Sequence, residues 1–331
     1  MRFSPDLFLS VRFPAANVMQ NLHEPWKTMH WTRSGRSPSV RRQHFSKARV
    51  VSRTIYINGE YVAEEEAKVS VFDRGFLFGD GIYEVTAVID GKLIDNDLHL
   101  ARLERSLKEI SIPMPLPVDE IVKVQQELRD RNGLTEGVIY LQVTRGEADR
   151  DFGYGEDMKP NFIAFTQNKN LVNANSLKNG VAVDIVPDNR WARRDIKTVM
   201  LLGQVLAKKA VKANGFHEAW LVEDGFVTEG ASSTAFILTG DNVIVTRPNS
   251  HAVLPGCTRR AVMKIIEEEN LTLEERLFTV EEAAAAREAF LTSASSLVTP
   301  VIRIGDRTIG DGKPGPITRR LQGIYLDLAR A

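Results

Sequence analysis

Turn dipeptides between apolar runs constrain the fold of this chain more than any other feature. Apolar stretches break at Asn58-Gly59, Asp90-Gly91 and Asp224-Gly225. Such dipeptides favour two-residue β-hairpin turns, because both turn residues there need positive φ. Hairpins join antiparallel strands, whereas a doubly wound fold needs a crossover between parallel neighbours. The pattern therefore predicts an α+β fold rather than strict βαβ alternation.

Helical periodicity and a polar stretch predict how the chain is divided. Leu100, Leu103 and Leu107 lie on one face of a predicted helix. Further helices are expected up to Asn132-Gly133, directly after Lys197, from Arg259 to Glu269 and at the C-terminus, and residues 289–304 are expected to form one strand. The Asn-rich stretch 169–180 is the predicted linker. We expect an N-terminal domain of residues 54–168 and a C-terminal domain of residues 181–331.

The first 53 residues differ from the rest in charge. They contain ten lysines and arginines against Asp6 and Glu24, and they show no sustained periodicity. An organellar transit peptide has this composition, and so does a stretch translated from a start codon placed too early. We expect residues 1–53 to be a disordered leader without a role in chemistry. The body would then be cytoplasmic, or mitochondrial or plastid if the leader is a genuine transit peptide.

Composition and missing motifs exclude several classes of function. The formal net charge is zero, which argues against nucleic acid as a main partner. The single Cys257 excludes an intramolecular disulfide and a cysteine-based zinc site, and we expect no metal. No apolar run approaches 18 residues, so no membrane span is expected. The stretch FGDGIYE lacks the third glycine and the βαβ setting of a dinucleotide-binding motif.

The remaining polar residues suit pyridoxal 5′-phosphate. This cofactor needs a lysine amine, a carboxylate for its ring nitrogen and a phosphate cup, usually at a helix N-terminus. Lys197 has the cations Arg193 and Arg194 beside it, which would favour a reactive neutral amine. Glu229 ends a predicted strand, and Gly256-Cys257-Thr258 precedes a predicted helix. Each feature also has an ordinary explanation: a solvated lysine, an acid that aids solubility, and a simple helix cap.

The order of these blocks is more specific than any one of them. Together they resemble the fold-type IV pyridoxal-phosphate aminotransferases, most closely the D-amino-acid (D-alanine) aminotransferases. The resemblance covers residues 54–330 and implies a two-domain α+β fold, with a smaller N-terminal α/β domain and a larger C-terminal domain that has a β-barrel-like core. It is carried by DRGFLFGDGIYEVTAVIDGKL, HLARL, DIKTVMLLGQVLAKK, EAWLVEDGFVTEGASSTAFIL, LPGCTRRAV and LTSASSLVTPVIRIG.

The resemblance implies a role for each matching residue. Lys197 would form the Schiff base and shuttle a proton during ping-pong transamination between an amino acid and a 2-oxo acid. Glu229 would pair with the ring nitrogen, and Ala294 stands where the D-amino-acid enzymes carry threonine, so Ser295 is a candidate replacement. The other matches are the phosphate-binding Arg102, the phosphate turn Cys257 and Thr258, the phosphate-side Ser293, the active-site Tyr83, and Ser232 and Ser233 under the ring.

One position departs from the pattern and bears on the substrate. The D-amino-acid enzymes grip the substrate α-carboxylate with an Arg-x-His pair, and here Arg150 is followed by Phe152 in place of histidine. Branched-chain aminotransferases and aminodeoxychorismate lyases share the fold and remain alternatives, although GASST after Glu229 differs from the GTAAN usual in the branched-chain enzymes. A non-catalytic dimeric scaffold is a further alternative. The resemblance also implies a homodimer.

Overall fold

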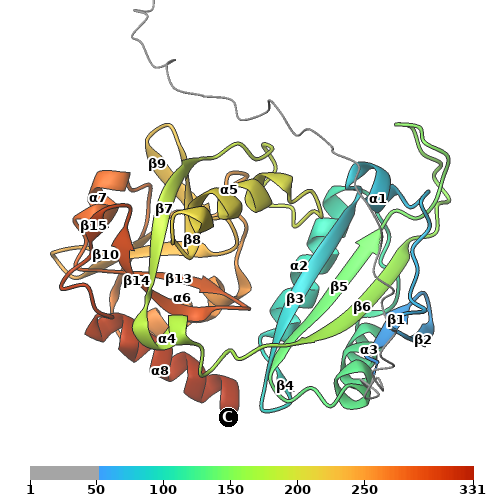
Figure 1. Cartoon of the computed structure of the whole chain (residues 1–331), viewed down its shortest axis with the longest axis horizontal. Helices are drawn as coiled ribbons and strands as arrows, with labels where there is room; N and C mark the ends of the chain where they lie inside the picture. The colour runs from blue at the N-terminus through green and yellow to red at the C-terminus, as the bar shows by residue number, and fades with distance from the viewer. Residues whose placement is uncertain (1–51) are drawn as a thin grey trace, which may run out of the picture. The chain divides into compact units, whose positions relative to one another are not determined.

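The computed structural model describes residues 52–331 and confirms the α+β class. The leader prediction falls outside these residues, apart from Ser52 and Arg53. Figure 1 shows strands gathered into two sheets with helices packed against them. Among the described residues, no helix is both long and apolar enough to cross a membrane.

The first sheet is six-stranded and wholly antiparallel, in the order β2-β1-β6-β5-β3-β4. Its turns follow from local sequence: Asn58 and Gly59 have φ of 49° and 102°, and Asp90 and Gly91 have φ of 50° and 76°. The predicted hairpins are therefore confirmed. The strands are β1 (Thr54–Ile57), β2 (Glu60–Ala63), β3 (Gly81–Ile89), β4 (Lys92–Leu93), β5 (Gly137–Thr144) and β6 (Asn161–Asn168).

Two amphipathic helices cover one face of this sheet. They are α2 (Asn96–Glu109) and α3 (Val118–Arg131), and the short α1 (Arg74–Phe78) precedes β3. The predicted stripe of Leu100, Leu103 and Leu107 is buried in one apolar cluster with Ile139 and Leu141 of β5. The other face of β3, β5 and β6 is left to line a cavity.

The second sheet is nine-stranded and mixed. Its order is β12-β11-β10-β13-β14-β7-β8-β9, with β15 pairing β14. The pairs β14–β7, β7–β8 and β11–β12 are parallel, and the others are antiparallel. The strands are β7 (Val181–Pro187), β8 (Glu218–Glu223), β9 (Phe226–Gly230), β10 (Thr234–Leu238), β11 (Val243–Thr246), β12 (Thr272–Glu275), β13 (Glu288–Ser293), β14 (Leu297–Ile304) and β15 (Arg307–Thr308).

Helices pack on the second sheet, and its apolar core reaches into the first. Ala87 and Ile89 of β3 lie in one buried cluster with Phe236 of β10, Phe290 of β13 and Tyr325 of the C-terminal helix. Apolar packing therefore joins the two sheets. The helices are α4 (Asn175–Asn179), α5 (Leu202–Ala213), α6 (Cys257–Glu268), α7 (Val280–Ala284) and α8 (Pro316–Arg330).

Three details differ from the sequence prediction. Residues 289–304 form the hairpin β13–β14 rather than one strand, because the backbone turns at 294–296 and Leu297 takes φ of 51°. The predicted linker contains α4 and buries Leu171 and Leu177, since Leu171 and Val172 donate backbone amides to Glu136. Helix α6 begins at Cys257 rather than Arg259.

Candidate active site

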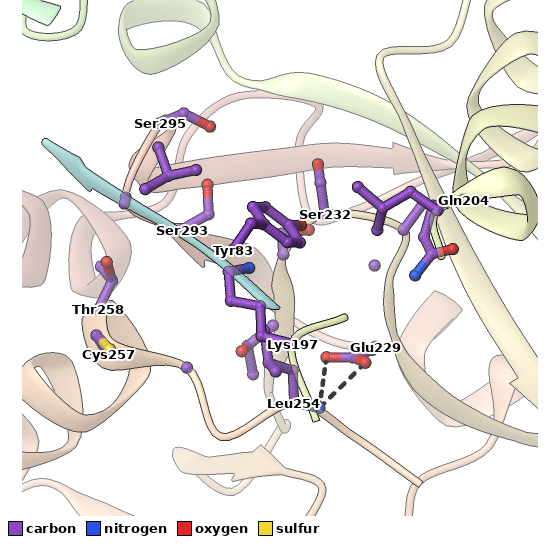
Figure 2. Close-up of a pocket in the computed structure, with 18 of the residues that line it drawn as sticks. Tyr83, Lys197, Gln204, Glu229, Ser232, Leu254, Cys257, Thr258, Ser293 and Ser295 are labelled. Atoms are coloured by element: carbon purple, nitrogen blue, oxygen red, sulfur yellow. Dashed lines mark hydrogen bonds between the residues drawn. The ribbon is translucent and has the colours of Figure 1, made fainter. Parts of the chain in front are cut away.

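A cavity of about 320 Å³ opens between the two sheets. This volume lies at the lower end of the range typical of small-molecule sites, about 300–1,000 Å³. It collects all the predicted site residues except Arg150 (Figure 2). The predicted residues that line it are Tyr83, Arg102, Lys197, Glu229, Ser232, Ser233, Cys257, Thr258, Ser293, Ala294 and Ser295.

Backbone pairing holds Lys197 opposite Tyr83. Lys197 lies before α5, as predicted, in a segment that pairs with the start of β3. The Tyr83 amide donates to the Lys197 carbonyl at 3.0 Å, and the Val199 amide donates to the Gly81 carbonyl at 3.0 Å. The Lys197 Nζ atom lies 4.2 Å from the centroid of the Tyr83 ring. The amine therefore faces the cavity from a segment whose position both sheets determine.

Arg193 and Arg194 do not act as free cations beside Lys197. Arg193 is paired with Asp195 and Glu109, and Arg194 binds Glu223 through two hydrogen bonds of 2.9 and 2.6 Å. These carboxylates neutralise both guanidinium groups. The geometry therefore does not support activation of Lys197 by Arg193 and Arg194.

Glu229 ends β9 with its carboxylate buried at the floor of the cavity. Its Oε1 atom accepts from Arg190 Nη1 at 2.6 Å, and both oxygens are 3.2 Å from the Leu254 amide nitrogen (Figure 2). Burial raises the pKa of Glu229, while Arg190 and the Leu254 amide oppose that rise. The carboxylate is thus placed to share a proton with a basic ring nitrogen.

Arg190 belongs to a buried ion network that sequence reasoning missed. Its Nε and Nη2 atoms donate to the two oxygens of Asp188 at 2.9 and 2.7 Å, while Nη1 binds Glu229. The Thr228 hydroxyl also donates to Asp188, at 2.7 Å. One guanidinium therefore fixes two buried carboxylates. The only local signal was the Asp-x-Arg spacing directly after β7.

A phosphate-sized set of donors lies at the other end of the cavity. Cys257 and Thr258 form the first turn of α6, so their amides have no acceptor inside the helix. Ser293 Oγ is buried and has no hydrogen-bond partner among residues 52–331. A Cβ atom on Gly256 would lie 2.9 Å from Thr234 Oγ1, so glycine keeps this turn compact. Unpaired amides, a helix N-terminus and an unsatisfied hydroxyl fit a phosphate group, and with Lys197 and Glu229 they fit pyridoxal 5′-phosphate.

Arg102 reaches this end of the cavity but is already strongly bound. Its Nε and Nη2 atoms donate to the two oxygens of Glu84 at 2.7 and 2.8 Å, and Nη1 donates to the Pro255 carbonyl at 2.9 Å. The His99 ring lies 2.8 Å from the same carboxylate through Nδ1. Sequence reasoning missed Glu84 and His99, although His99 lies three residues before Arg102 on the same helix face.

The charges of this cluster favour an anion nearby. Burial would raise the pKa of Glu84, but Arg102 and His99 hold it well below its ordinary value. Burial would lower the pKa of His99, but the Cys257 thiol and the Glu84 carboxylate raise it to about 9. At neutral pH, two cations therefore face one carboxylate, which leaves one positive charge beside the phosphate turn.

His99 makes stability depend on pH. A folded-state pKa of about 9 means that its contribution is complete below the ordinary histidine value near 6.5 and is lost as pH rises through about 9. We expect the cofactor-free protein to lose unfolding free energy on the order of 3 kcal/mol over this window. His99→Gln should abolish this slope in urea titrations at pH 6 and 9, and His251→Gln, at an exposed position, should keep it. If the unfolding free energy of wild type and of His99→Gln fell equally between pH 6 and pH 9, His99 would not be the source of the pH dependence.

Ser232 and Ser233 share one acceptor that the sequence did not reveal. Both hydroxyls donate to Glu218 Oε2, at 2.7 and 3.3 Å. Lys208 Nζ donates to Ser232 Oγ at 2.9 Å from α5. The serine turn after Glu229 is therefore held by a carboxylate on β8, with its hydroxyl protons directed to that carboxylate.

Arg150 does not line the cavity of its own chain. It is exposed in the loop between β5 and β6, with its guanidinium carbon 5.7 Å from the Phe78 ring and 5.9 Å from the Phe152 ring. From the sequence, the alternative to a role at the substrate is an exposed loop arginine paired with Asp149 or Asp151; neither pair is among the ion pairs of the described residues. The structure therefore gives Arg150 no place in the lining of its own chain's cavity.

Comparison with known proteins identifies the family of the chain. The family described as amino-transferase class IV matches residues 81–304. A D-alanine aminotransferase of Staphylococcus aureus (strain MSSA476) is 43% identical over 270 residues, 81% of this chain and 95% of the relative. One from Bacillus licheniformis is 40% identical over 269 residues, with 81% and 94% covered.

Solved structures give the same fold. The branched-chain amino acid aminotransferase of Escherichia coli superposes with a TM-score of 0.79 at 25% identity, covering 84% of this chain and 94% of that one. A branched-chain enzyme of T.th., solved with pyridoxamine 5′-phosphate, gives a TM-score of 0.73 at 25% identity, with the same coverage. The fold and the pyridoxal-phosphate dependence expected from the sequence are confirmed: this chain belongs to the class IV aminotransferases.

Proposed function

We propose that this enzyme transfers an amino group between a D-amino acid and a 2-oxo acid. The observation that carries the proposal is one cavity holding the Lys197 amine, the buried Glu229 carboxylate and the phosphate-fitting turn at Cys257. The D-amino-acid preference is supported by relatives named D-alanine aminotransferases, at 40–43% identity.

The protein groups divide the chemistry between binding and proton transfer. Pyridoxal 5′-phosphate, when bound, supplies an aldehyde carbon for the amino group and an electron-withdrawing ring. Lys197 would hold that carbon through its amine and, once free, would carry a proton between the substrate Cα and that carbon, first as base and then as acid. Glu229 keeps the ring nitrogen protonated. The Cys257 and Thr258 amides with Ser293 Oγ bind the phosphate, and Arg102 and His99 add positive charge there.

Tyr83 and the serine turn position the ring. Tyr83 lies against Lys197 and stacks on Tyr140, with ring centroids 5.6 Å apart. Ser232 and Ser233 face the cavity from the opposite element, and Ala294 and Ser295 lie beside Ser293 in the β13–β14 turn. Ser295 is the residue we propose for the hydrogen bond that Ala294 cannot make.

We further propose that the enzyme is a homodimer in which Arg150 reaches the partner subunit's cavity. Two groups of exposed large apolar side chains support this proposal. Leu202, Val205 and Leu206 at the start of α5 are 57–70% exposed, and Phe72 and Phe76 near α1 are 52% and 71% exposed. A second copy would cover them and bring its own Arg150 to the substrate. A cytoplasmic location stays a prediction from the sequence.

Loss of Arg150 should act on the substrate carboxylate alone. Removing a charge-assisted hydrogen bond costs about 1.5–3 kcal/mol, so Arg150→Ala should lower kcat/KM for D-alanine roughly 10- to 150-fold. Ethylamine, which is alanine without its carboxylate, should react as with wild type. Stopped-flow absorbance of the bound cofactor measures both half-reactions. Equal losses for both amines, or no loss for either, would show that Arg150 is not the carboxylate anchor.

The branched-chain alternative shares the fold of the two solved neighbours described above. A panel of D- and L-amino acids, read by the change in cofactor absorbance, separates the alternatives. We expect D-alanine to react and L-leucine to react poorly. The opposite order would favour a branched-chain enzyme, whereas product release without consumption of an oxo acid would favour a lyase.

A further inference from the structure

Two buried arginines outside the cavity hold the loop that follows Arg150. Arg74 is 3% exposed and donates to three consecutive carbonyls, those of Asp151, Phe152 and Gly153, at 2.7, 3.3 and 3.4 Å. Since a guanidinium is a rigid group with several donors, these bonds restrain the orientation of the loop backbone as well as its distance from Arg74.

The second arginine, Arg145, shares an anchor with the first. Asp80 accepts from Arg74 Nε at 2.9 Å and from Arg145 Nε and Nη2 at 2.8 and 3.0 Å. Arg145 also donates to the carbonyls of Ile110 and Ser111, at 2.6 and 3.0 Å. Both guanidinium groups are therefore held in place by several hydrogen bonds to residues next to the first sheet.

The Tyr154 ring contacts both guanidinium groups. It lies 3.8 Å from the Arg145 guanidinium carbon and 5.2 Å from that of Arg74, measured to the ring centroid. Both distances fall within the range of cation–π attraction. Tyr154 is itself half-exposed, so this ring contributes little to the apolar core.

The other backbone restraints on this loop lie before Arg150: the Ala148 amide donates to the Phe72 carbonyl at 3.2 Å, and Glu147 forms an isolated bridge with Asp73. No helix or strand lies between the end of β5 at Thr144 and the start of β6 at Asn161. Among the described residues, Arg150 forms no ion pair, and its guanidinium carbon lies 5.7 Å and 5.9 Å from the Phe78 and Phe152 ring centroids. Its direction is therefore set by the backbone that Arg74, Arg145 and Tyr154 restrain.

We propose that Arg74, Arg145 and Tyr154 form a clamp that positions Arg150 for the substrate carboxylate. This inference rests on the proposed role of Arg150. Phe152, the residue in the histidine position, is 80% exposed and its ring centroid lies 5.7 Å from that of Phe78, so it adds one partial apolar contact to the loop and no donor for the substrate. One fixed arginine then replaces a pair of donors.

Variants at Tyr154 test the clamp without touching a buried charge. Tyr154→Ala should raise KM for D-alanine roughly 5- to 30-fold, the equivalent of one or two partly desolvated cation–π contacts. The carboxylate contact is equally strong in the bound substrate and in the transition state, so its weakening should leave kcat near the wild-type value. Tyr154→Phe keeps the ring and should restore KM. Ethylamine should respond to neither change.

A second readout needs neither substrate nor cofactor. Hydrogen exchange of the amides at 150–156 should speed up in Tyr154→Ala and stay slow in Tyr154→Phe. The matched control is Tyr61→Ala. Tyr61 lies in β2 of the same sheet, and its ring centroid is 4.3 Å from the guanidinium carbon of Arg131, so this variant also removes a tyrosine–arginine contact. It should change neither loop exchange nor KM.

The outcomes separate the clamp from the proposed function. Wild-type KM in Tyr154→Ala, with Arg150→Ala still selective for D-alanine, overturns the clamp alone, whether or not loop exchange changes. A Tyr154→Phe variant as impaired as Tyr154→Ala also overturns it. If Arg150→Ala affects neither amine, the carboxylate role of Arg150 fails, and the clamp as a positioning device fails with it.

Discussion

Replacement of Lys197 by alanine is expected to abolish transamination while the fold stays intact. In the proposed mechanism its amine both binds the cofactor carbon and moves the Cα proton, and its Nζ atom lies 4.2 Å from the Tyr83 ring centroid; Lys169 is the other lysine that lines the described cavity. General acid–base catalysis alone contributes about 10²–10⁴-fold, so loss of both roles should lower kcat by roughly 10³-fold or more. Steady-state turnover of D-alanine with 2-oxobutyrate measures the effect.

Covalent trapping gives an independent readout for Lys197. Borohydride reduction should leave a cofactor adduct on wild type, located at Lys197 by peptide mass spectrometry, and none at this position in the variant. Lys209→Ala is the matched control, because Lys209 is exposed on α5 and does not line the cavity. Near-wild-type turnover in Lys197→Ala would remove the core of the proposed mechanism.

Glu229→Gln should give the second-largest loss. Glutamine keeps the shape of the side chain and can still accept from Leu254 and Arg190, but it carries no charge to hold a proton on the ring nitrogen. Removing one preorganised electrostatic partner typically costs about 10²–10³-fold in kcat. The absorbance of the bound cofactor, titrated with pH, should show that the ring nitrogen loses its proton at lower pH than in wild type.

A second buried carboxylate provides the control for this change. Glu288 is 5% exposed and accepts the amides of Ile317 and Thr318 at the start of α8, away from the cavity. Glu288→Gln should leave kcat and the cofactor spectrum unchanged. If both glutamine variants lose activity alike, general damage to the second sheet explains the result better than a role of Glu229 at the ring.

Local signals in the sequence predicted the elements that depend on local geometry. The turns at Asn58-Gly59 and Asp224-Gly225 and the leucine stripe of α2 were confirmed because residues close in sequence determine them. The turn between β13 and β14 was missed because Ser-Ala-Ser-Ser has no glycine, proline or asparagine. Strand β12, TLEE, was missed because it is short and mostly exposed and pairs with β11 from a distance.

A family pattern predicted the residues expected to face the cofactor, whereas the residues that hold them in place were not predicted. Glu84 meets Arg102 across 18 residues, Arg190 meets Glu229 across 39, and Glu218 meets Ser232 across 14. Each pair joins different elements, so neither composition nor periodicity relates the two partners. The position of Arg150 outside the cavity of its own chain could not be predicted either, because a sequence motif carries no information about where the loop that bears it lies in the fold.

The pairing of residues 197–199 with the start of β3 gives cofactor uptake a meaning beyond catalysis. The second sheet alone would contain Lys197, Glu229 and the phosphate turn without the strand that holds the lysine in place. Strong cofactor binding is therefore expected only after both sheets have folded and joined. A ligand at a hundred times its Kd adds about 2.7 kcal/mol to stability, so cofactor binding should raise the unfolding free energy of the joined sheets by a similar amount. In a mixture of folding chains, the yellow absorbance of bound cofactor should report the fraction of molecules in which the two sheets have joined.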